Sequence, residues 1–400
     1  MKILYIHQYF KTPREPGATR IYFIVQQLLK EGHEVTVITQ NKKITASDRE
    51  EVYIDGINIV YLKNAYSNEM SIPMRIKSFF NFMYKSSFEV FKHKNIDLVI
   101  ATSTPLSVGL PALLLKKIKD IPFVFEVRDL WPEVPIQMGG LKNPLVKKIA
   151  IWFEKTIYKN ASHIVALSPG MYEGVIKYVS SDKVSMIPNM AKKEHFWPRE
   201  KSKDCIKKLQ LRESSFKVIH FGTMGIANGL QYFIEAAKIA HDKGIMDVDF
   251  ILLGEGKAEK TLKLFAESNK LTNVFFYERL AMKETSEVVN VCDISVVPFL
   301  NIPILSTNSP NKLFDSLAAG KPIIVNSNGW TKKMVEENSC GAFVDPENPN
   351  ELFELIMEWK NQPNLLKIMG DNSRKLAETT YDESILTKRF ASIINTFNNK

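Results

Sequence analysis

Three cysteines in 400 residues are too few and too scattered for the common kinds of cysteine site. Cys205, Cys292 and Cys340 are odd in number, which argues against a disulfide framework, and none stands at a metal-ligand spacing from another. Clusters of His, Asp and Glu with metal-binding spacing are also missing. The sequence therefore predicts no obligatory metal ion, and we expect the chain to work in the reducing cytoplasm.

Long apolar stretches are missing as well. No window approaches about 18 uninterrupted apolar residues, the length that a membrane-spanning helix needs. The apolar run at residues 3–6 is too short for a signal peptide. No G-x-G-x-x-G sequence opens a helix after it, which disfavours a dinucleotide-dependent oxidoreductase. Zinc-finger spacing and an RNP-like strand are absent, so nucleic acid is not an expected partner.

What remains is the composition of a soluble globular protein, with 45% hydrophobic and 24% charged residues. The formal net charge of +9 suits a phosphorylated ligand or anionic lipid, and a lysine-rich solvated surface is the simpler explanation. At roughly 150 residues per domain, the length predicts two or three domains.

Short β-rich runs alternate with helical patterns along the chain, which is typical of parallel α/β sheets. The expected strands lie at 3–6, 34–39, 97–101, 122–126 and 163–167, and then at 216–221, 248–253, 274–276, 294–297 and 322–325. We predict an α/β fold of two Rossmann-like, doubly wound parallel-sheet domains that face across a cleft. They comprise residues 1–195 and 216–380, with a charge-rich linker at 196–215. An amphipathic helix at about 380–400 is expected to pack back on the first domain.

The strongest local motif is the segment from Ser309 to Pro322. Because proline suits the first helical position, a helix is expected to begin at about Pro310, with its free N–H groups and positive dipole end facing the cleft. That end suits a diphosphate. Lys312 adds a positive charge there, and Asp315, one turn further on, can accept hydrogen bonds from a ribose diol. A plain capped helix with both side chains in solvent is the alternative.

Further candidates follow expected strands at their carboxyl ends, where ligands of open α/β sheets bind. They are Gly17, Arg20, Arg128, Asp129, Gly222, Thr223, Asn228, Gly254 and Arg279. The glycines allow backbone N–H groups to approach a phosphate closely. Asp129 is a candidate base or orienting group for a hydroxyl of a second substrate, and a helix cap is an equally good interpretation. A surface position is the alternative for Arg20.

These motifs resemble the donor half of glycosyltransferase family 4, whose members are retaining enzymes of the GT-B architecture. The Gly17 loop and the run from Gly32 to Val37 are similar to its N-terminal half, so the resemblance covers essentially the whole chain. The stretch from Arg128 to Glu133 resembles bacterial capsule and O-antigen transferases of the N-acetylfucosamine type. Members catalyse transfer through positioning and charge stabilisation, with the leaving diphosphate oxygen helping to deprotonate the acceptor hydroxyl on the same face.

The resemblance also shows where this chain departs from the family. Asp315 takes the ribose position, where glutamate is usual, and Thr307 stands where a carboxylate usually contacts the donor sugar. Thr223 and Asn228 occupy the positions of an arginine and a lysine that bind the diphosphate. The contact with the donor sugar is expected to pass to Thr307 Oγ1 or to backbone groups near Asn308 and Ser309. Lys312, Arg20, Arg279 and the helix N-terminus are the candidates for neutralising the diphosphate. The expected donor-binding set is Gly17, Arg20, Gly222, Thr223, Asn228, Gly254, Arg279, Thr307, Ser309, Pro310, Asn311, Lys312 and Asp315, with Asp129, Arg128 and Lys312 as candidate catalytic residues.

The resemblance implies transfer of a sugar from a UDP-sugar to a lipid-linked saccharide in bacterial capsule or O-antigen synthesis. The sugar is expected to be an N-acetylated amino sugar such as N-acetyl-L-fucosamine, and the acceptor a polyprenyl-diphosphate-linked sugar. No cofactor is expected. Two alternatives are a nucleotide-sugar 2-epimerase of the same fold and a degenerate, non-catalytic protein that binds nucleotide or membrane.

Two stretches suggest contact with a membrane. Residues 70–94 and 141–159 each interleave apolar and aromatic side chains with lysines, and a basic amphipathic helix can lie on an anionic membrane surface. A helix packed on the domain with its lysines outward is the alternative, favoured for the second stretch. We therefore expect the protein to be cytoplasmic and peripheral at the inner face of the cell membrane.

Overall fold

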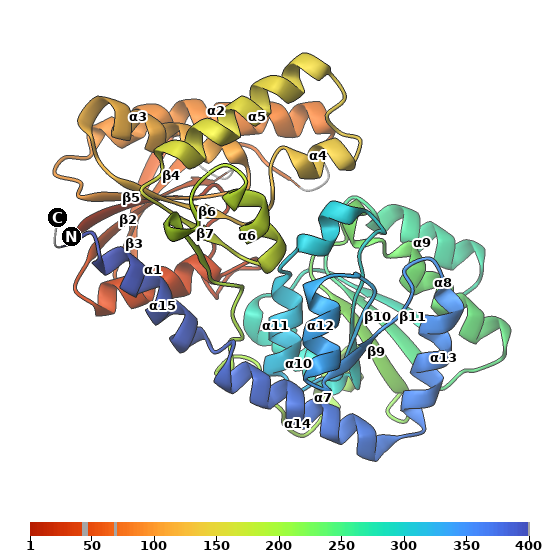
Figure 1. The fold of residues 1–400 in the computed structure, drawn as a ribbon. Helices are drawn as coiled ribbons and strands as arrows, with labels where there is room; N and C mark the ends of the chain where they lie inside the picture. Colours follow the sequence, from red (N-terminus) through yellow and green to blue (C-terminus); the bar gives the residue numbers. More distant parts are fainter. Residues whose placement is uncertain (42–46, 68–69, 399–400) are drawn as a thin grey trace.

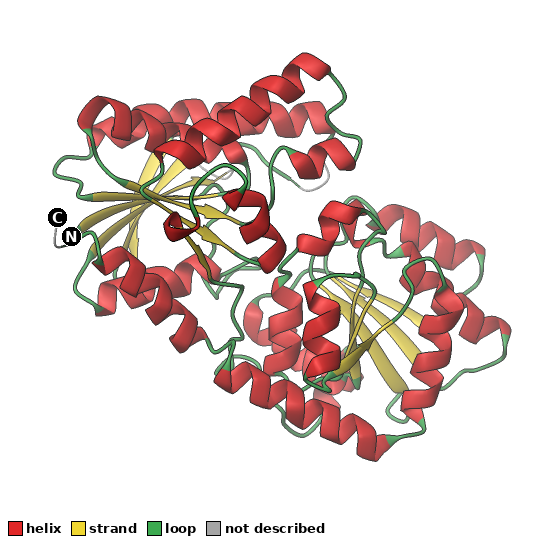
Figure 2. Ribbon diagram, in the orientation of Figure 1, coloured by secondary structure: helices red, strands yellow, loops and turns green. Residues whose placement is uncertain are grey.

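The computed structural model describes residues 1–41, 47–67 and 70–398, which form two α/β domains side by side (Figure 1). The first domain contains an eight-stranded sheet (Figure 2). In sheet order its strands are β3 (Arg49–Ile54), β4 (Ile57–Lys63), β2 (Glu34–Asn41), β1 (Lys2–Ile6), β5 (Leu98–Thr102), β6 (Phe123–Val127), β7 (His163–Ala166) and β8 (Val184–Met186). Only the β3–β4 pair is antiparallel among these described strands, and the other pairs are parallel.

The second domain contains a six-stranded sheet in which every described pair is parallel. Its strands in sheet order are β11 (Val274–Tyr277), β10 (Val248–Leu253), β9 (Phe216–Phe221), β12 (Ile294–Val297), β13 (Ile323–Val325) and β14 (Gly341–Phe343). All residues of β9, β10 and β12 are buried. Burial on both faces explains their nearly continuous apolar sequences, because helices cover both sides of a parallel sheet.

Helices flank both sheets. Those of the first domain are α1 (Arg20–Lys30), α2 (Ile72–Glu89), α3 (Gly109–Lys119), α4 (Glu133–Gln137), α5 (Pro144–Asn160) and α6 (Pro169–Ile176). Those of the second are α8 (Gln231–Asp242), α9 (Glu259–Ser268), α10 (Met282–Val291), α11 (Asn311–Ala318), α12 (Trp330–Glu337), α13 (Pro349–Lys360) and α14 (Pro363–Thr379). Helices α2, α3 and α5 form one layer of the first domain, on the side opposite α1 (Figure 1). The predicted α/β fold of two parallel-sheet domains is confirmed, with the antiparallel strand β3 as an unpredicted addition.

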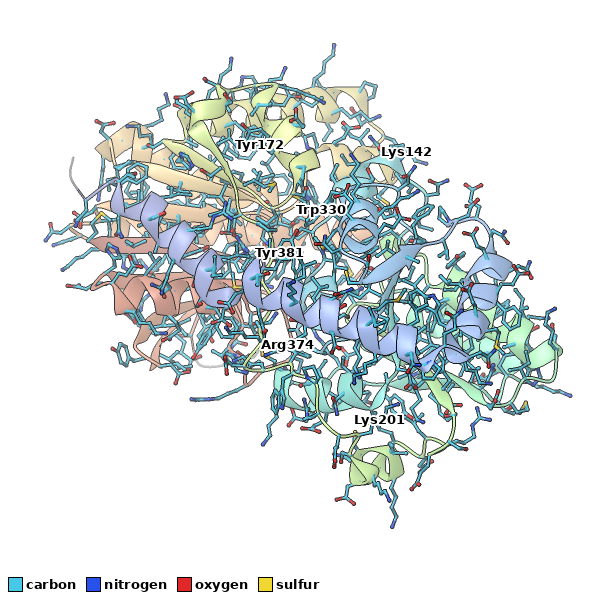
Figure 3. All side chains as sticks on the ribbon, turned by 60° about the horizontal axis from the view of Figure 1, so that its bottom comes forward. Lys142, Tyr172, Lys201, Trp330, Arg374 and Tyr381 are labelled. Atoms are coloured by element: carbon cyan, nitrogen blue, oxygen red, sulfur yellow. The ribbon has the colours of Figure 1, made fainter. Side chains whose placement is uncertain are left out.

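Two segments connect the domains. Residues 196–215 contain the short helix α7 (Lys203–Lys208), which packs on α10 of the second domain. At the end of the chain, α14 packs on α11 and α15 (Glu383–Asn395) packs on α1, so the last two helices run along both domains (Figure 3). Arg374 of α14 donates hydrogen bonds to the carbonyls of Lys193, Phe196 and Ala318. Both domains are thus tied together on the side behind the cleft.

Candidate active site

A cleft of about 960 Å³ lies between the two domains, lined by residues at or after the carboxyl ends of β1, β2, β5 and β6 of the first sheet and of β9, β10, β11 and β12 of the second. The carboxyl ends of both sheets therefore open into the same space, as expected for ligand binding in open parallel sheets. Most of the predicted site residues contribute to its walls. They are Gly17, Arg128, Asp129, Gly222, Thr223, Asn228, Arg279, Ser309, Pro310, Asn311, Lys312 and Asp315.

Helix α11 points its amino end into this cleft. The helix begins at Asn311, and Pro310 occupies the N-cap position without a side-chain hydrogen bond. Ser309, Pro310 and Asn311 all line the cleft. Since the first-turn N–H groups of a helix lack intrahelical acceptors, this end offers uncapped donors to an anion, together with the positive end of the helix dipole.

Lys312 sits in the first turn of α11, and its side chain turns toward the loop after β9. Its Nζ lies 3.2 Å from Nε2 of His220 and 3.2 Å from Oδ1 of Asn228. His220 Nδ1 lies 3.2 Å from the Val296 carbonyl oxygen, so the neutral ring donates there and leaves Nε2 to accept from Lys312. Burial lowers the pKa of Lys312 to about 7. An anion in the cleft would favour its charged form.

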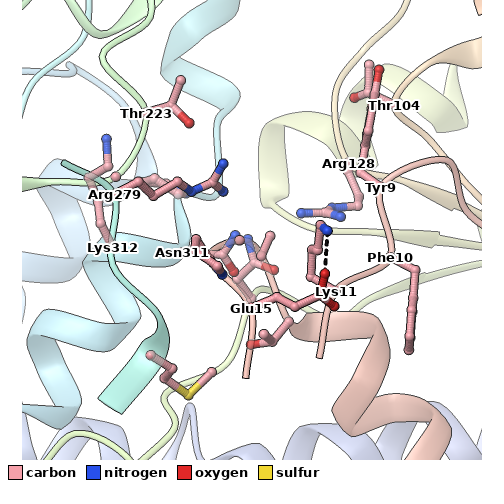
Figure 4. A pocket seen from close by; sticks show the side chains of 18 of the residues that line it. Tyr9, Phe10, Lys11, Glu15, Thr104, Arg128, Thr223, Arg279, Asn311 and Lys312 are labelled. Carbon is pink, nitrogen blue, oxygen red and sulfur yellow. Dashed lines mark hydrogen bonds and ion pairs between the residues drawn. The ribbon is translucent and has the colours of Figure 1, made fainter. Parts of the chain in front are cut away.

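Two arginines approach the cleft from opposite domains (Figure 4). Arg279 follows β11, and Arg128 follows β6. Neither guanidinium makes a hydrogen bond or ion pair with another residue in the described part of the chain. Burial lowers the pKa of both groups, but arginine stays protonated at any ordinary pH. Two unpaired cations facing one buried space indicate an anionic ligand.

The glycine loop of the second domain brings two strand ends together. A Cβ on Gly254 would lie 1.8 Å from the carbonyl oxygen of Gly222, so the two loops meet at a distance that only glycine permits. Gly222, with φ of 109°, lines the cleft, as do Leu253 and Glu255 on either side of Gly254. Gly254 forms the close contact between the ends of β9 and β10, and its contact with the donor stays a prediction.

Asp315 and Ser309 are held by the segment that follows β8. Lys192 Nζ lies 2.5 Å from Oδ1 of Asp315, and both side chains are almost completely buried. Asn189 donates from Nδ2 to the Ser309 carbonyl at 2.5 Å, and its backbone N–H donates to Ser309 Oγ at 3.3 Å. Asn189 and Lys192 both line the cleft. Neither was predicted, because nothing in the sequence indicates that an irregular segment lies beside a helix more than 100 residues away.

Asp129 lies beside Arg128 at the end of β6. Its Oδ2 accepts a hydrogen bond from Thr104 Oγ1 at 2.5 Å, and burial raises the pKa of the carboxyl group. The side chain lines the cleft and caps no helix. A half-buried carboxyl group with a raised pKa beside an unpaired arginine is a suitable arrangement for proton transfer or for orienting a hydroxyl.

Arg20 does not face the cleft. Its side chain is fully buried under it, with an ion pair of 2.9 Å to Glu126 and hydrogen bonds to the carbonyls of Ile187 and Pro188. The prediction that Arg20 binds the donor is therefore wrong. The signal for this pairing was Glu126 itself, since a carboxylate in the middle of the apolar strand β6 needs a buried cation.

Removing this cation should be costly. We expect Arg20→Met to lower the free energy of unfolding by about 3–5 kcal/mol, because Glu126 would be left as an unpaired buried charge. Urea denaturation measures the effect. Arg14→Met is the control, since it breaks an ion pair with Asp55 in which the arginine side chain is 75% exposed. That loss should stay below about 1 kcal/mol, and equal losses in the two variants would contradict the assignment.

Thr307 also lies outside the cleft lining. It ends the 3₁₀ helix η5 (Pro303–Thr307), and its hydroxyl donates to the Ile304 carbonyl at 2.7 Å. Its own carbonyl accepts from Ser168 Oγ, and its methyl group packs against Gly170 of α6. The expectation that Thr307 replaces the family carboxylate at the donor sugar is therefore wrong, because the residue belongs to the contact between the two domains.

No group of three His, Cys, Asp or Glu side chains gathers in a metal-binding arrangement within the described residues. An Asp-x-Asp sequence is present at Asp247–Asp249, at the amino end of β10, and Asp249 is paired there with Arg212. It lies outside the cleft lining. The expectation that no metal is required stays a prediction.

Comparison with known proteins agrees with this geometry. Residues 17–194 match the family described as "Glycosyltransferase Family 4", and residues 201–376 match "Glycosyl transferases group 1". The chain is a glycosyltransferase.

Individual relatives of the glycosyltransferase are distant. An uncharacterized glycosyltransferase of Methanocaldococcus jannaschii is 27% identical over 33% of this chain and 36% of its own length. The UDP-Gal:alpha-D-GlcNAc-diphosphoundecaprenol alpha-1,3-galactosyltransferase of Escherichia coli is 25% identical over 72% of each chain. Among solved structures, sucrose-phosphate synthase of Thermosynechococcus elongatus superposes with a TM-score of 0.78 at 16% identity, covering 100% of this chain and 99% of that one. HepE of Anabaena, solved with UDP-glucose, gives 0.72 at 18% identity, covering 99% and 100%. These structures share the GT-B fold.

The outer layer of the first domain exposes apolar side chains. Phe80, Tyr84 and Phe88 recur every fourth residue on α2 and are about 60% exposed. Leu145, Ile149 and Trp152 form a similar stripe on α5. Lysines flank both stripes. None of the described helices of the glycosyltransferase is long and apolar enough to cross a membrane.

Proposed function

We propose that the glycosyltransferase moves a sugar, with retention of configuration, from a UDP-sugar to a saccharide linked to a polyprenyl diphosphate. The observation that carries this proposal is the set of positive groups around the amino end of α11. Lys312, Arg279 and the uncapped helix end converge on one wall of the cleft. Such a set suits the two phosphates of a nucleotide sugar.

Lys312 takes over the charge that is missing from the glycine loop. Its ammonium reaches Asn228, the position at which the family resemblance expects a lysine. Arg279 stands close to the Gly17 loop of the opposite domain, since its guanidinium lies 3.4 Å from where a Gly17 Cβ would be. A diphosphate bound by Lys312 and Arg279 would therefore lie beside the Gly17 loop of the first domain.

The reaction requires positioning more than a nucleophile. In the proposed mechanism, the bond between the anomeric carbon of the sugar and the diphosphate oxygen breaks, and the oxygen of the acceptor hydroxyl forms a bond to that carbon on the same face. The leaving diphosphate oxygen accepts the proton of the acceptor hydroxyl. Lys312 and Arg279 would stabilise the charge that grows on the diphosphate. Asp129 would orient the acceptor hydroxyl, and Arg128 would add positive charge from the opposite wall.

The names of the relatives support a proposal for the substrates. The Escherichia coli relative is named as acting from UDP-galactose on a diphosphoundecaprenol acceptor, and a Streptococcus pneumoniae relative is named alpha-galactosylglucosyldiacylglycerol synthase. We propose a role in glycolipid or surface-polysaccharide synthesis, with an N-acetylated amino sugar such as N-acetyl-L-fucosamine as donor on the strength of the Arg128–Glu133 stretch. No metal or other cofactor is required in this proposal.

A donor screen tests it. Binding of UDP-N-acetyl-L-fucosamine, UDP-galactose, UDP and GDP is measured by thermal shift, since a ligand that binds the folded state raises Tm by mass action. Release of UDP is then followed with and without a polyprenyl-diphosphate-linked sugar, in the presence of EDTA. Acceptor-dependent release of UDP supports the transferase. Epimerised donor without acceptor would support the 2-epimerase instead, and binding without turnover the degenerate protein.

We also propose that the exposed faces of α2 and α5 lie on an anionic membrane, where they would meet the lipid of the acceptor. Apolar stripes flanked by lysines suit such a surface. We expect the Phe80→Ser, Tyr84→Ser, Phe88→Ser triple variant to reduce co-flotation with vesicles containing phosphatidylglycerol by at least about tenfold, since each buried aromatic contributes about 1.5–3 kcal/mol.

Leu264→Ser is the matched control, because Leu264 is an exposed apolar residue of α9 on the other domain. It should float like the unchanged protein. Binding that is equally strong in the triple variant, or that is absent at low salt in the unchanged protein, would refute the membrane proposal.

A further inference from the structure

The ion pair between Lys192 and Asp315 joins the two halves of the molecule at the bottom of the cleft. Lys192 comes from the segment after β8, the last strand of the first sheet, and Asp315 from α11 in the second domain. The Lys192 side chain is 4% exposed and that of Asp315 is 12% exposed. Both line the cleft, so the pair is buried in protein on one side and adjoins the ligand space on the other.

This pair engages only one of the two carboxylate oxygens of Asp315. Lys192 donates to Oδ1, and Oδ2 accepts no hydrogen bond from any residue that the structure describes. Burial acts to raise the pKa of Asp315, and the positive charge of Lys192 opposes that rise. Lys192 thus favours the ionised carboxylate and fixes its rotation, which leaves Oδ2 as an acceptor for a ligand hydroxyl.

The same segment holds the other end of the donor-binding motif. Asn189, three residues before Lys192, binds Ser309 through both its side-chain amide and its backbone N–H. Asn189 Oδ1 is buried and has no hydrogen-bond partner among the described residues, so it is a second unused acceptor. Ser309 and Asp315 are therefore both set in place by one short stretch of the first domain.

We propose that Lys192 positions Asp315 for binding the donor ribose. Lys192 holds the carboxylate so that one oxygen is free to accept hydrogen bonds from the 2′- and 3′-hydroxyl groups of the nucleotide. This inference rests on the proposed donor site and names the residue that makes it competent. Lys192 does not touch the reacting atoms. Its replacement should therefore weaken donor binding much more than it slows the chemical step.

The other charges near the pair do not take its place. Glu383, at the start of α15, and His195 lie within electrostatic reach of Lys192, and Lys193 beside it is paired with Asp382 at 2.9 Å. In the absence of Lys192, none of these groups is in hydrogen-bond contact with Asp315 in the described structure. Lys193 provides a matched control, since its pair lies outside the cleft lining.

The experiment compares UDP with 2′,3′-dideoxy-UDP by isothermal titration calorimetry. Hydrogen bonds to a charged group predict that the unchanged protein binds UDP at least about tenfold more tightly than the dideoxy compound. In Lys192→Met the ratio should fall to within about threefold, and Lys192→Arg should restore most of it. Lys193→Met should behave like the unchanged protein. Steady-state kinetics of Lys192→Met should show a raised donor KM with kcat changed by less than about threefold.

Asp315→Asn completes a double-mutant cycle. It should lower the preference for UDP over dideoxy-UDP as much as Lys192→Met does. Adding Lys192→Met to it should lower this preference no further, because Lys192 acts through Asp315. The inference would be overturned if Lys192→Met kept the full preference for UDP over dideoxy-UDP, or if Lys193→Met lost this preference to the same extent. Lys192→Gln, which keeps a hydrogen-bond donor without the charge, replaces the methionine variant if circular dichroism shows that variant to be unfolded, and it should also lose the ratio.

Failure of the proposed function would be seen separately. If the unchanged protein binds UDP and dideoxy-UDP equally, the ribose contact is wrong and the inference falls, while nucleotide binding stands. If it binds neither UDP nor GDP, ADP or TDP, the donor site itself is wrong.

Discussion

Lys312→Met should lower kcat/KM for the nucleotide sugar by about a hundredfold, close to 3 kcal/mol of transition-state stabilisation. The Lys312 side chain is half-buried at the amino end of α11, where it lines the cleft and can make a charge-assisted contact with the diphosphate. The loop after β9, which carries Thr223 and Asn228, offers no charge that could substitute. Initial-rate kinetics with saturating acceptor measure the loss.

Folding should not suffer from this change. Because burial of the ammonium lowers its pKa, the folded state disfavours the charged group, and a methionine of similar volume should leave Tm unchanged or raise it. Lys283→Met is the control, since Lys283 is exposed at the start of α10 beside the cleft residue Met282. Equal kcat/KM values for Lys312→Met and Lys283→Met would contradict the donor-site assignment.

Donor affinity should also fall as pH rises, because Lys312 loses its charge. A lysine is charged below its pKa, which is about 7 here, so the free protein loses the cation as pH rises. The KM for a nucleotide sugar should increase by up to about tenfold per pH unit above neutrality, until the pKa of the bound state is reached. His220 beside Lys312 stays neutral, because its pKa is far below the usual value, and Arg279 stays charged. In Lys312→Met the dependence should disappear.

The fold was accessible from the sequence because the central parallel strands are apolar runs buried on both faces. The strands that were missed are β3, β8 and β14, which lie at the sheet edges, and β4, which forms a hairpin with β3. The β3–β4 hairpin nevertheless had a signal. Asp55 and Gly56 form a two-residue turn with φ of 51° and 84°, and an Asp-Gly pair between strand-like runs is typical of such hairpins. β8 and β14 have three residues each, too few for a period to be seen.

The site was accessible to a smaller extent. A helix that starts at a proline after a strand could be placed at the cleft from local rules, and α11 begins within one residue of the expected point. Local rules do not give the rotation of a helix, which is why Arg20 was expected in the cleft and lies instead against Glu126. Thr307 was placed by resemblance, and the family's acidic position does not reach the cleft in this chain. Lys192 is absent from the prediction because long-range ion pairs leave no periodic signal.

Arg128→Gln should lower kcat by about a hundredfold, with the Kd for the intact nucleotide sugar changed by less than about threefold. The guanidinium approaches from the first domain, opposite Arg279 and Lys312, which bind the donor on the second (Figure 4). Ground-state binding of the nucleotide would rest on the second domain. The extra negative charge that develops on the leaving diphosphate is what a cation on the opposite wall can stabilise, and Arg128 has no competing partner among the described residues.

Separate measurements of Kd and kcat distinguish this role from simple donor binding. Arg128→Lys keeps the charge and should recover part of kcat, although it loses the planar donor geometry of arginine. Arg279→Gln is the matched variant from the other wall, and it should raise the Kd for the intact nucleotide sugar because its charge contributes already in the ground state. If Arg128→Gln raised the Kd by the same factor by which it lowers kcat/KM, with kcat unchanged, Arg128 would be a binding residue. The two walls of the cleft would then have the same function, and the distinction between a donor-binding wall and a transition-state wall would fail.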